Sequence, residues 1–319
     1  MRGAWSLVLV AAVLAGCAKR PATPRASTDR ETIRVEVTEH GRRVVRDVPL
    51  EDYVAASALS EFAPAAGEPA AVEGMFEVQT VIARTYALAH RGRHAAAGFD
   101  LCSTSHCQLY EPERLSTSRW SALARDAAAR TRGLVLAFGG RVADAVYHSD
   151  CGGRTSAAAD VWAGPGVPYL RSQVDDGDAA SAHAAWTYAV DDAALIRALD
   201  GDPRTRVGSR LDSIAILTRD GSGRAQRVLL RGEHDVAVRG SDLRDVLSAA
   251  FGARSIRSTL FDVAPGRRRF VFSGSGFGHG VGLCQVGAFA RVSKGHSPAS
   301  VLQRYYPGAA VLSAAGLTR

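Results

Sequence analysis

Several kinds of sequence feature are scarce in this chain of 319 residues. Aromatic residues make up only 7% of it, and the basic residues behind the formal net charge of +7 are scattered along the sequence. The chain therefore lacks the basic stripe and the stacking surface that are typical of nucleic-acid-binding proteins. Neither the P-loop spacing nor Gly-x-Gly-x-x-Gly fits any glycine-rich stretch, which disfavours a nucleotide-binding loop.

Long apolar runs are also scarce. An apolar run from Ala4 to Ala15 is too short to span a membrane, follows Arg2, and ends in Leu14-Ala15-Gly16-Cys17. This pattern resembles a bacterial lipoprotein signal, in which cleavage before Cys17 and acylation of its thiol would anchor the protein. An ordinary signal peptide with an incidental cysteine is the alternative.

These features predict a division of the chain. We expect a signal peptide over residues 1–16, and a lipidated Cys17 with a disordered tether over 17–31, because that stretch is rich in proline and basic residues. The remainder, 32–319, is expected to be an extracytoplasmic domain on the periplasmic face of a bacterial membrane. It is long enough to bury a sizeable core, as one large domain or as two closely packed lobes.

Strand and helix patterns are interleaved without a regular strand–helix–strand alternation. We expect a hairpin of 33–37 with 43–48 around His40-Gly41, and a second hairpin of 134–138 with 142–147. Helices are expected over 51–60, 70–90, 117–132, 241–250 and 298–306, and further strands over 213–218, 227–231 and 269–272. The predicted fold class is α+β, with mixed helices and antiparallel hairpins.

Glycine is concentrated in one run, where Gly274, Gly276, Gly278, Gly280 and Gly282 alternate with other residues. On a strand, alternate side chains point to opposite faces, so this run would leave one face bare and present Phe277, His279 and Val281 on the other. Glycine weakens a strand, which indicates that a ligand or another chain approaches closely here. A glycine-rich turn or bulge region is the alternative interpretation.

Five motifs in order support a family resemblance. They are Asp47 to Val54 with Ser60-Glu61, Gln79 to Leu88, Cys102 to Gln108, Tyr147 to Thr155, and Gly276 to Gln285 with Tyr305-Tyr306-Pro307-Gly308. Together, from about Ile33 to Leu312, they resemble the stage II sporulation protein D family, the SpoIID/LytB domain. The resemblance implies a lytic transglycosylase that cleaves peptidoglycan glycan strands held in a groove of the fold. The alternative is a non-catalytic glycan-binding protein that modulates a cell-wall amidase.

The resemblance implies that Glu61 is the catalytic acid. Glu61 follows an apolar-rich helix, near its C-terminal end and beside Phe62, and both surroundings disfavour a carboxylate. A raised pKa would keep the group protonated and able to act as an acid. The connection to Ala83-Arg84-Thr85-Tyr86 is longer than in the family pattern, which leaves Glu68, Glu73 and Glu77 as weaker candidates.

A lytic transglycosylase needs one carboxyl group, whereas most glycosidases need two. Glu61 would protonate the oxygen between N-acetylmuramic acid and N-acetylglucosamine. It would then accept the proton of the muramyl 6-hydroxyl, so that a 1,6-anhydro end forms. The groups expected to bind glycan or to stabilise developing charge are Arg84, Tyr147, His148, Ser149, Gly278, His279, Gly280 and Gln285.

Cysteines and histidines suggest a metal site. By resemblance to zinc-containing members, His94, Cys102, His106 and Cys107 would bind a structural zinc ion with no coordination position open, which disfavours a zinc amidase. His90 is an alternative to His94, and a Cys102–Cys107 disulfide is the competing interpretation. Cys151 and Cys284 form a second pair, for which a disulfide and reduced thiols both remain open.

Overall fold

The computed structural model describes residues 31–176, 181 and 183–318. The predicted signal peptide, Cys17 and nearly all of the predicted tether lie outside these residues. Within the described part, no helix combines the length and the apolar character that crossing a membrane requires. The fold is α+β, as predicted, with short sheets and helices mixed along the chain.

The chain begins with an antiparallel hairpin of β1 (Thr32–Glu39) and β2 (Arg42–Pro49), which confirms the first predicted hairpin. His40 and Gly41 both have positive φ, 50° and 76°, as a tight two-residue hairpin turn requires. The short strand β3 (Leu101–Cys102) adds to β1 in parallel. A 3-10 helix, η2 (Ala95–Ala97), precedes it.

Two helices follow the hairpin and form the centre of this part of the molecule. They are α1 (Leu50–Glu61) and the longer α2 (Pro69–Ala89), both close to the predicted bounds. The single helix predicted over 117–132 is instead two, α3 (Arg114–Thr117) and α4 (Ser121–Arg130). The break lies at Ser118, whose backbone is extended and whose hydroxyl accepts the N–H of Trp120.

The second predicted hairpin is only partly present. β4 (Leu134–Phe138) pairs with β5 (Arg141–Val142) and with the C-terminal strand β14 (Ala310–Ser313), but β5 stops five residues short of the predicted Tyr147. The chain then forms β6 (Tyr147–His148), which pairs in parallel with β13 (Leu283–Cys284). Sequence reasoning missed this pairing because its two strands are far apart in the chain.

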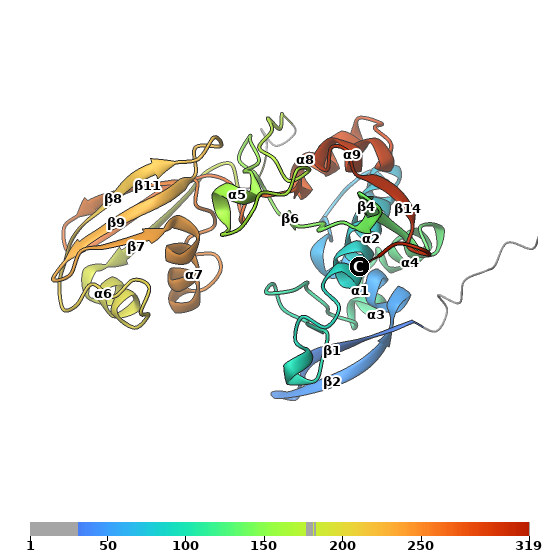
Figure 1. The fold of residues 1–319 in the computed structure, drawn as a ribbon, viewed down its shortest axis with the longest axis horizontal. Coiled ribbons are helices and arrows are strands. Elements are labelled where there is room, and N and C mark those ends of the chain that lie inside the picture. Colours follow the sequence, from blue (N-terminus) through green and yellow to red (C-terminus); the bar gives the residue numbers. More distant parts are fainter. Residues whose placement is uncertain (1–30, 177–180, 182, 319) are drawn as a thin grey trace, which may run out of the picture.

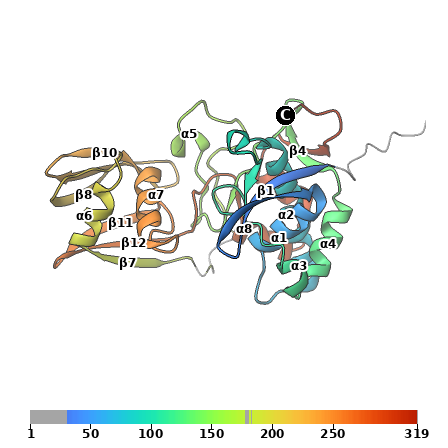
Figure 2. The same cartoon turned by 90° about the horizontal axis from the view of Figure 1, so that it is seen from below.

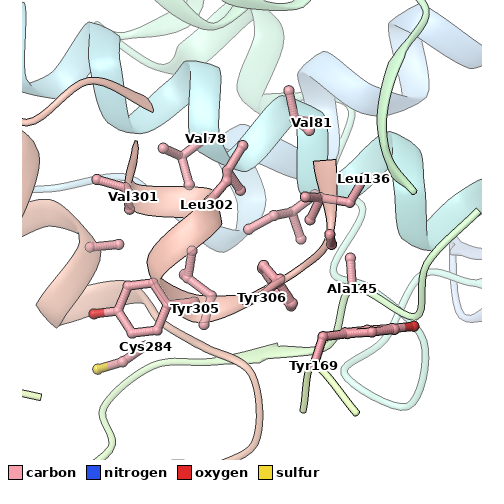
Figure 3. Packing of buried hydrophobic residues seen from close by; sticks show 14 of the residues in the cluster. Val78, Val81, Leu136, Ala145, Tyr169, Cys284, Val301, Leu302, Tyr305 and Tyr306 are labelled. Atoms are coloured by element: carbon pink, nitrogen blue, oxygen red, sulfur yellow. The ribbon is translucent and has the colours of Figure 1, made fainter. Parts of the chain in front are cut away.

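Helices α8 (Gln285–Ser293) and α9 (Pro298–Tyr305) complete the first lobe by packing against α2. Figure 3 shows Val78 of α2 close to Val301 and Leu302 of α9, with Tyr305 beside Cys284 in the same core. This core fixes the ends of β6 and β13 relative to α2.

A second lobe has its own core. It contains β7 (Trp186–Asp191), β8 (Leu211–Arg219), β9 (Ala225–Gly232), β10 (Val236–Arg239), β11 (Phe261–Gly266), β12 (Arg269–Gly274), α6 (Asp192–Asp200) and α7 (Gly240–Phe251). The predicted strands over 213–218, 227–231 and 269–272 and the helix over 241–250 are confirmed. This lobe lies at one end of the molecule, with the segment that carries α5 (Ala158–Val161) between it and the first lobe (Figures 1 and 2).

The glycine run links the two lobes and is not a strand. β12 ends at Gly274, and Gly276, Gly278, Gly280 and Gly282 all have positive φ, between 72° and 106°. Their open sides face other parts of the chain: a Cβ on Gly282, for example, would lie 2.0 Å from the Val146 carbonyl oxygen. The prediction of a bare strand face was therefore wrong: the run is irregular chain held by isolated bridges at Phe277, Gly278 and Val281.

Candidate functional site

Glu61 is the last residue of α1 and is only partly exposed. Its Oε1 accepts a hydrogen bond of 2.7 Å from the backbone N–H of Leu109. Beside it, the Ser60 hydroxyl oxygen accepts the N–H of Glu111 at 2.9 Å. The segment 109–111 therefore holds both the end of α1 and the Glu61 carboxyl in place.

The surroundings of Glu61 favour its protonated form. Burial raises the pKa of the Glu61 carboxyl, because protein atoms replace water that would solvate the charge. The Leu109 N–H and the Tyr147 hydroxyl lower the pKa, but burial, the largest single effect, together with the Glu111 carboxylate leaves it raised. A raised pKa favours the protonated carboxyl that a general acid needs, and the same group can accept a proton back once it has donated its own.

Tyr147 and Gln285 reach Glu61 through the parallel pairing of β6 with β13, in which Tyr147 lies opposite Leu283. The Tyr147 hydroxyl is buried beside the Glu61 carboxyl without a hydrogen bond of ordinary length, and burial and Glu61 both raise its pKa. The Gln285 side-chain amide donates to the Glu61 backbone carbonyl at 3.3 Å and to Gln79 Oε1 at 3.4 Å. Three predicted site residues are thus brought together.

His148 and His279 are neighbours, with ring centroids 5.5 Å apart, and Ser149 directly follows His148. His148 is 4% exposed, and its Nδ1 donates to the Val281 carbonyl at 3.1 Å. Burial, with the Arg244 and Arg224 cations, lowers the pKa of His279 to about 3, so its imidazole is neutral. His279 can orient a polar group but carries no charge. Ser149 is partly exposed, and its carbonyl accepts the N–H of Val286 at the start of α8.

Trp162 is a candidate that sequence reasoning missed. It follows α5, keeps 37% of its surface exposed, and its ring centroid lies 5.0 Å from that of His279. An exposed indole ring offers a flat apolar surface against which a sugar ring can stack. Its sequence neighbourhood contains no pattern that distinguishes it from a core tryptophan, so only its exposure and its contact with His279 reveal it.

The structure corrects the prediction that Arg84 binds glycan. Its side chain is fully buried, and it forms an ion pair with Glu51 and donates to the carbonyls of Leu134 and Ala128. These contacts join α2 to α1, α4 and β4 and leave no donor at the surface. Arg84 therefore stabilises the fold instead of contacting substrate.

Gly278 and Gly280 also do not form an open surface for glycan. A Cβ on Gly278 would lie 2.7 Å from that of His148, and one on Gly280 would lie 2.5 Å from the Arg224 guanidinium carbon. Glycine is needed at these two positions because other residues of the protein, and not a ligand, lie against them. Gly278 and Gly280 flank His279 and allow the chain that carries it to pack closely against His148 and Arg224.

The three alternative carboxylates are occupied elsewhere. Glu68 caps α2 by accepting the Ala70 N–H, while Glu73 and Glu77 form ion pairs with Arg130 at 2.6 and 2.8 Å. Among the residues that the structure describes, none of these three carboxylates contacts the groups around Glu61. Glu61 therefore remains the candidate for the acid.

A cluster of cysteine and histidine lies beside the loop that leads to Leu109. Ligand atoms of His94, Cys102, His106 and Cys107 all lie within 4.8 Å of one another. His94 Nε2 is 3.3 Å from Cys107 Sγ, and His106 Nδ1 is 3.7 Å from each sulfur. These separations are close to those in a tetrahedral zinc site, where ligand atoms lie about 3.3–3.8 Å apart.

The contacts bear on two alternatives for this cluster. His90, proposed in place of His94, instead contacts Asp144, with Nε2 2.9 Å from the carboxylate. The structure holds Cys102 and Cys107 as thiols, not as a disulfide. From Cys107 the chain continues through Gln108, which contacts Tyr53, to the Leu109 N–H on Glu61.

Comparison with known proteins supports the resemblance. Residues 38–138 match the family model of stage II sporulation protein (SpoIID), and residues 185–282 match a domain of unknown function, DUF8618. An uncharacterized protein of Brachyspira hyodysenteriae is 30% identical over 270 residues, which cover 83% of this chain and 67% of that protein.

Two Bacillus subtilis proteins are also similar. The stage II sporulation protein D is 24% identical over 308 residues, which cover 92% of this chain and 84% of that protein. The amidase enhancer is 27% identical over 281 residues, or 74% of this chain, and the match spans only 38% of that longer protein. Taken with the arrangement around Glu61, these matches establish that the chain belongs to the stage II sporulation protein D family.

Proposed function

We propose that the protein is a peptidoglycan lytic transglycosylase in which Glu61 is the single acid and base. The observation that supports this most directly is the partly exposed Glu61 carboxyl with a raised pKa. Glu111, the other carboxylate that acts on it, forms an ion pair with Arg114. One carboxyl suffices for intramolecular attack, whereas hydrolysis by most glycosidases requires two.

In this mechanism, protonated Glu61 donates to the glycosidic oxygen, and the bond from that oxygen to the muramyl anomeric carbon breaks. The Glu61 carboxylate, stabilised by the Leu109 N–H, then takes the proton of the muramyl 6-hydroxyl as its oxygen bonds to the anomeric carbon. No water is consumed. Tyr147 lies close enough to orient the carboxyl, and Gln285 fixes the end of α1.

The test is mass spectrometry of glycan strands after incubation with the protein, with and without prior removal of stem peptides by an amidase. The wild-type protein should produce 1,6-anhydro-muramyl ends, and Glu61→Gln should produce none, because an amide neither donates nor accepts the required proton. Glu77→Gln, on the outer face of α2, is the matched control and should retain activity. Undiminished anhydro product from Glu61→Gln would refute the mechanism.

A second function is favoured by the similarity to the amidase enhancer: a glycan-binding protein that modulates a cell-wall amidase. The same variant separates the two. If Glu61→Gln still stimulates a purified amidase on intact cell wall, while the wild type forms no anhydro ends, the modulating function replaces the enzymatic one.

We further propose that His94, Cys102, His106 and Cys107 bind a structural zinc ion. Their geometry fits, and a zinc ion would stabilise the loop that places Leu109 on Glu61. Metal analysis should find zinc bound there, and Cys107→Ser should lower the melting temperature. A metal-free native protein with linked Cys102 and Cys107 peptides would establish the disulfide instead.

We propose, finally, that acylated Cys17 anchors the protein to a bacterial membrane on its periplasmic face. The support is the sequence Leu14-Ala15-Gly16-Cys17 after the short apolar run. Labelled fatty acid should be incorporated by the wild type and not by Cys17→Ser. Equal incorporation, or recovery of both proteins in the soluble fraction, would contradict this.

A further inference from the structure

We infer that His148, Cys151 and Cys284 form a second metal site, for zinc or another thiophilic ion. Ligand atoms of these three residues lie within 4.8 Å of one another. All three are deeply buried: His148 is 4% exposed, and both cysteines are 0% exposed. The site shares no residue with the cluster at Cys102 and Cys107.

The histidine has the chemical form that a metal ligand needs. Its Nδ1 lies 3.1 Å from the Val281 carbonyl oxygen, and since a carbonyl can only accept, Nδ1 bears the hydrogen. Nε2 is then the nitrogen with the lone pair, and it is buried without a hydrogen-bond partner. Metal-binding histidines usually donate their second nitrogen to a backbone carbonyl or a carboxylate in this way. A buried, unpartnered nitrogen beside two sulfur atoms is explained if a metal ion binds it.

The Cys284 sulfur has the surroundings of a metal-bound thiolate. It caps α8 by accepting the Gly287 N–H at 3.4 Å, and it accepts the Cys151 N–H at 3.2 Å. Backbone N–H groups directed at sulfur compensate negative charge on it and orient it toward a metal. Cys151 and Cys284, which would both bind the ion, are thus already joined by a hydrogen bond from the Cys151 N–H to the Cys284 sulfur.

Charge favours a divalent ion with two thiolates. Arg224 is buried next to the site and donates to the Cys151 carbonyl at 2.6 Å. Two thiolates and Zn²⁺ are neutral together, so binding adds no net charge beside this guanidinium. Sulfur and imidazole ligands select zinc or copper(I) over magnesium or calcium. Three protein ligands leave the fourth tetrahedral position to another group, with water as the simplest choice.

Such an ion would connect the segments that build the catalytic site. Tyr147 and Gln285 are the two residues that reach Glu61. His148 directly follows Tyr147, and Cys284 directly precedes Gln285. The parallel contact of β6 and β13 has only two residue pairs, Leu283 with Tyr147 and Cys284 with His148. A metal ion bound by Cys284 and His148 would reinforce this short contact.

The experiment measures zinc per chain in the full-length protein, purified with a reducing agent and without chelator. The wild type should carry about two zinc ions, one for each four-coordinate site. The Cys102→Ser/Cys107→Ser variant and the Cys151→Ser/Cys284→Ser variant should each retain about one. Ser149→Ala, in the same loop but not a ligand, should retain both and is the matched control.

Cobalt substitution keeps the test decisive if the Cys151→Ser/Cys284→Ser variant fails to fold. In the Cys102→Ser/Cys107→Ser background, Co²⁺ should give a thiolate-to-cobalt charge-transfer band, which His148→Gln should shift or weaken. Absence of both zinc and cobalt from this background would overturn the inference. So would a Cys151–Cys284 disulfide in peptides of the native protein prepared without reductant.

Discussion

Substituting Gly280 by alanine tests whether the glycine run serves the fold or the substrate. Gly280 has a φ of +83°, and an added Cβ would lie 2.5–2.8 Å from three atoms of the Arg224 guanidinium group. Arg224 cannot easily withdraw, because it is buried and donates to the carbonyls of Cys151 and Arg154. We therefore expect Gly280→Ala to destabilise the protein.

The magnitude has two parts. An alanine in the left-handed region costs about 1–2 kcal/mol, and overpacking a well-filled site typically costs about 1–3 kcal/mol more. Gly41→Ala is the matched control: its φ is +76°, and nothing lies within 4 Å of an added Cβ. The difference between the two variants thus isolates the clash with Arg224, at about 1–3 kcal/mol.

The assay is thermal unfolding of both variants beside a glycan-strand binding measurement. For a large domain, 1 kcal/mol shifts the melting temperature by about 2–4 °C, so Gly280→Ala should melt roughly 2–12 °C below Gly41→Ala. Glycan binding by the folded fraction should be unchanged. Equal melting temperatures together with lost binding would show that glycan, and not Arg224, occupies the space beside Gly280.

Three further outcomes are expected. The pKa of Glu61 in the folded protein is raised above its ordinary value of 4.5, so the wild type loses stability as the pH rises from about 4.5 through the raised pKa. Glu61→Gln does not ionise, and its stability relative to wild type should therefore increase over this pH range. A relative stability that falls with pH in thermal scans would contradict the raised pKa. Arg84→Met should lower the free energy of unfolding by about 3–5 kcal/mol, since it leaves the Glu51 carboxylate without its partner, and Glu51→Gln in the same chain should recover part of the loss in denaturant titrations; unchanged stability would mean that the ion pair does not hold α1 to α2. Trp162→Ala should weaken glycan binding by the folded protein, because the exposed part of its ring is the surface offered for stacking; unaltered binding would exclude this ring as a glycan contact.

Local sequence determined those features whose parts lie close together in the chain. The alternation of β1 and β2 and the turn at His40-Gly41 specify their hairpin, because the pairing needs only a two-residue connection. The spacing of Cys102, His106 and Cys107 likewise places three ligand candidates within a few residues. The raised pKa of Glu61 could be anticipated from its position at the end of an apolar helix.

Only the tertiary structure decided the roles of residues whose partners are distant in sequence. The glycine run could be a strand or a turn or bulge region, and its positive φ values with close contacts to Val146, His148 and Arg224 exclude the regular strand. Arg84 belongs to a recognisable motif, but its ion pair with Glu51 makes it structural. His148, Cys151 and Cys284 meet only because β6 pairs with β13 across more than a hundred residues, a contact set by the packing of the whole lobe and not by any local pattern.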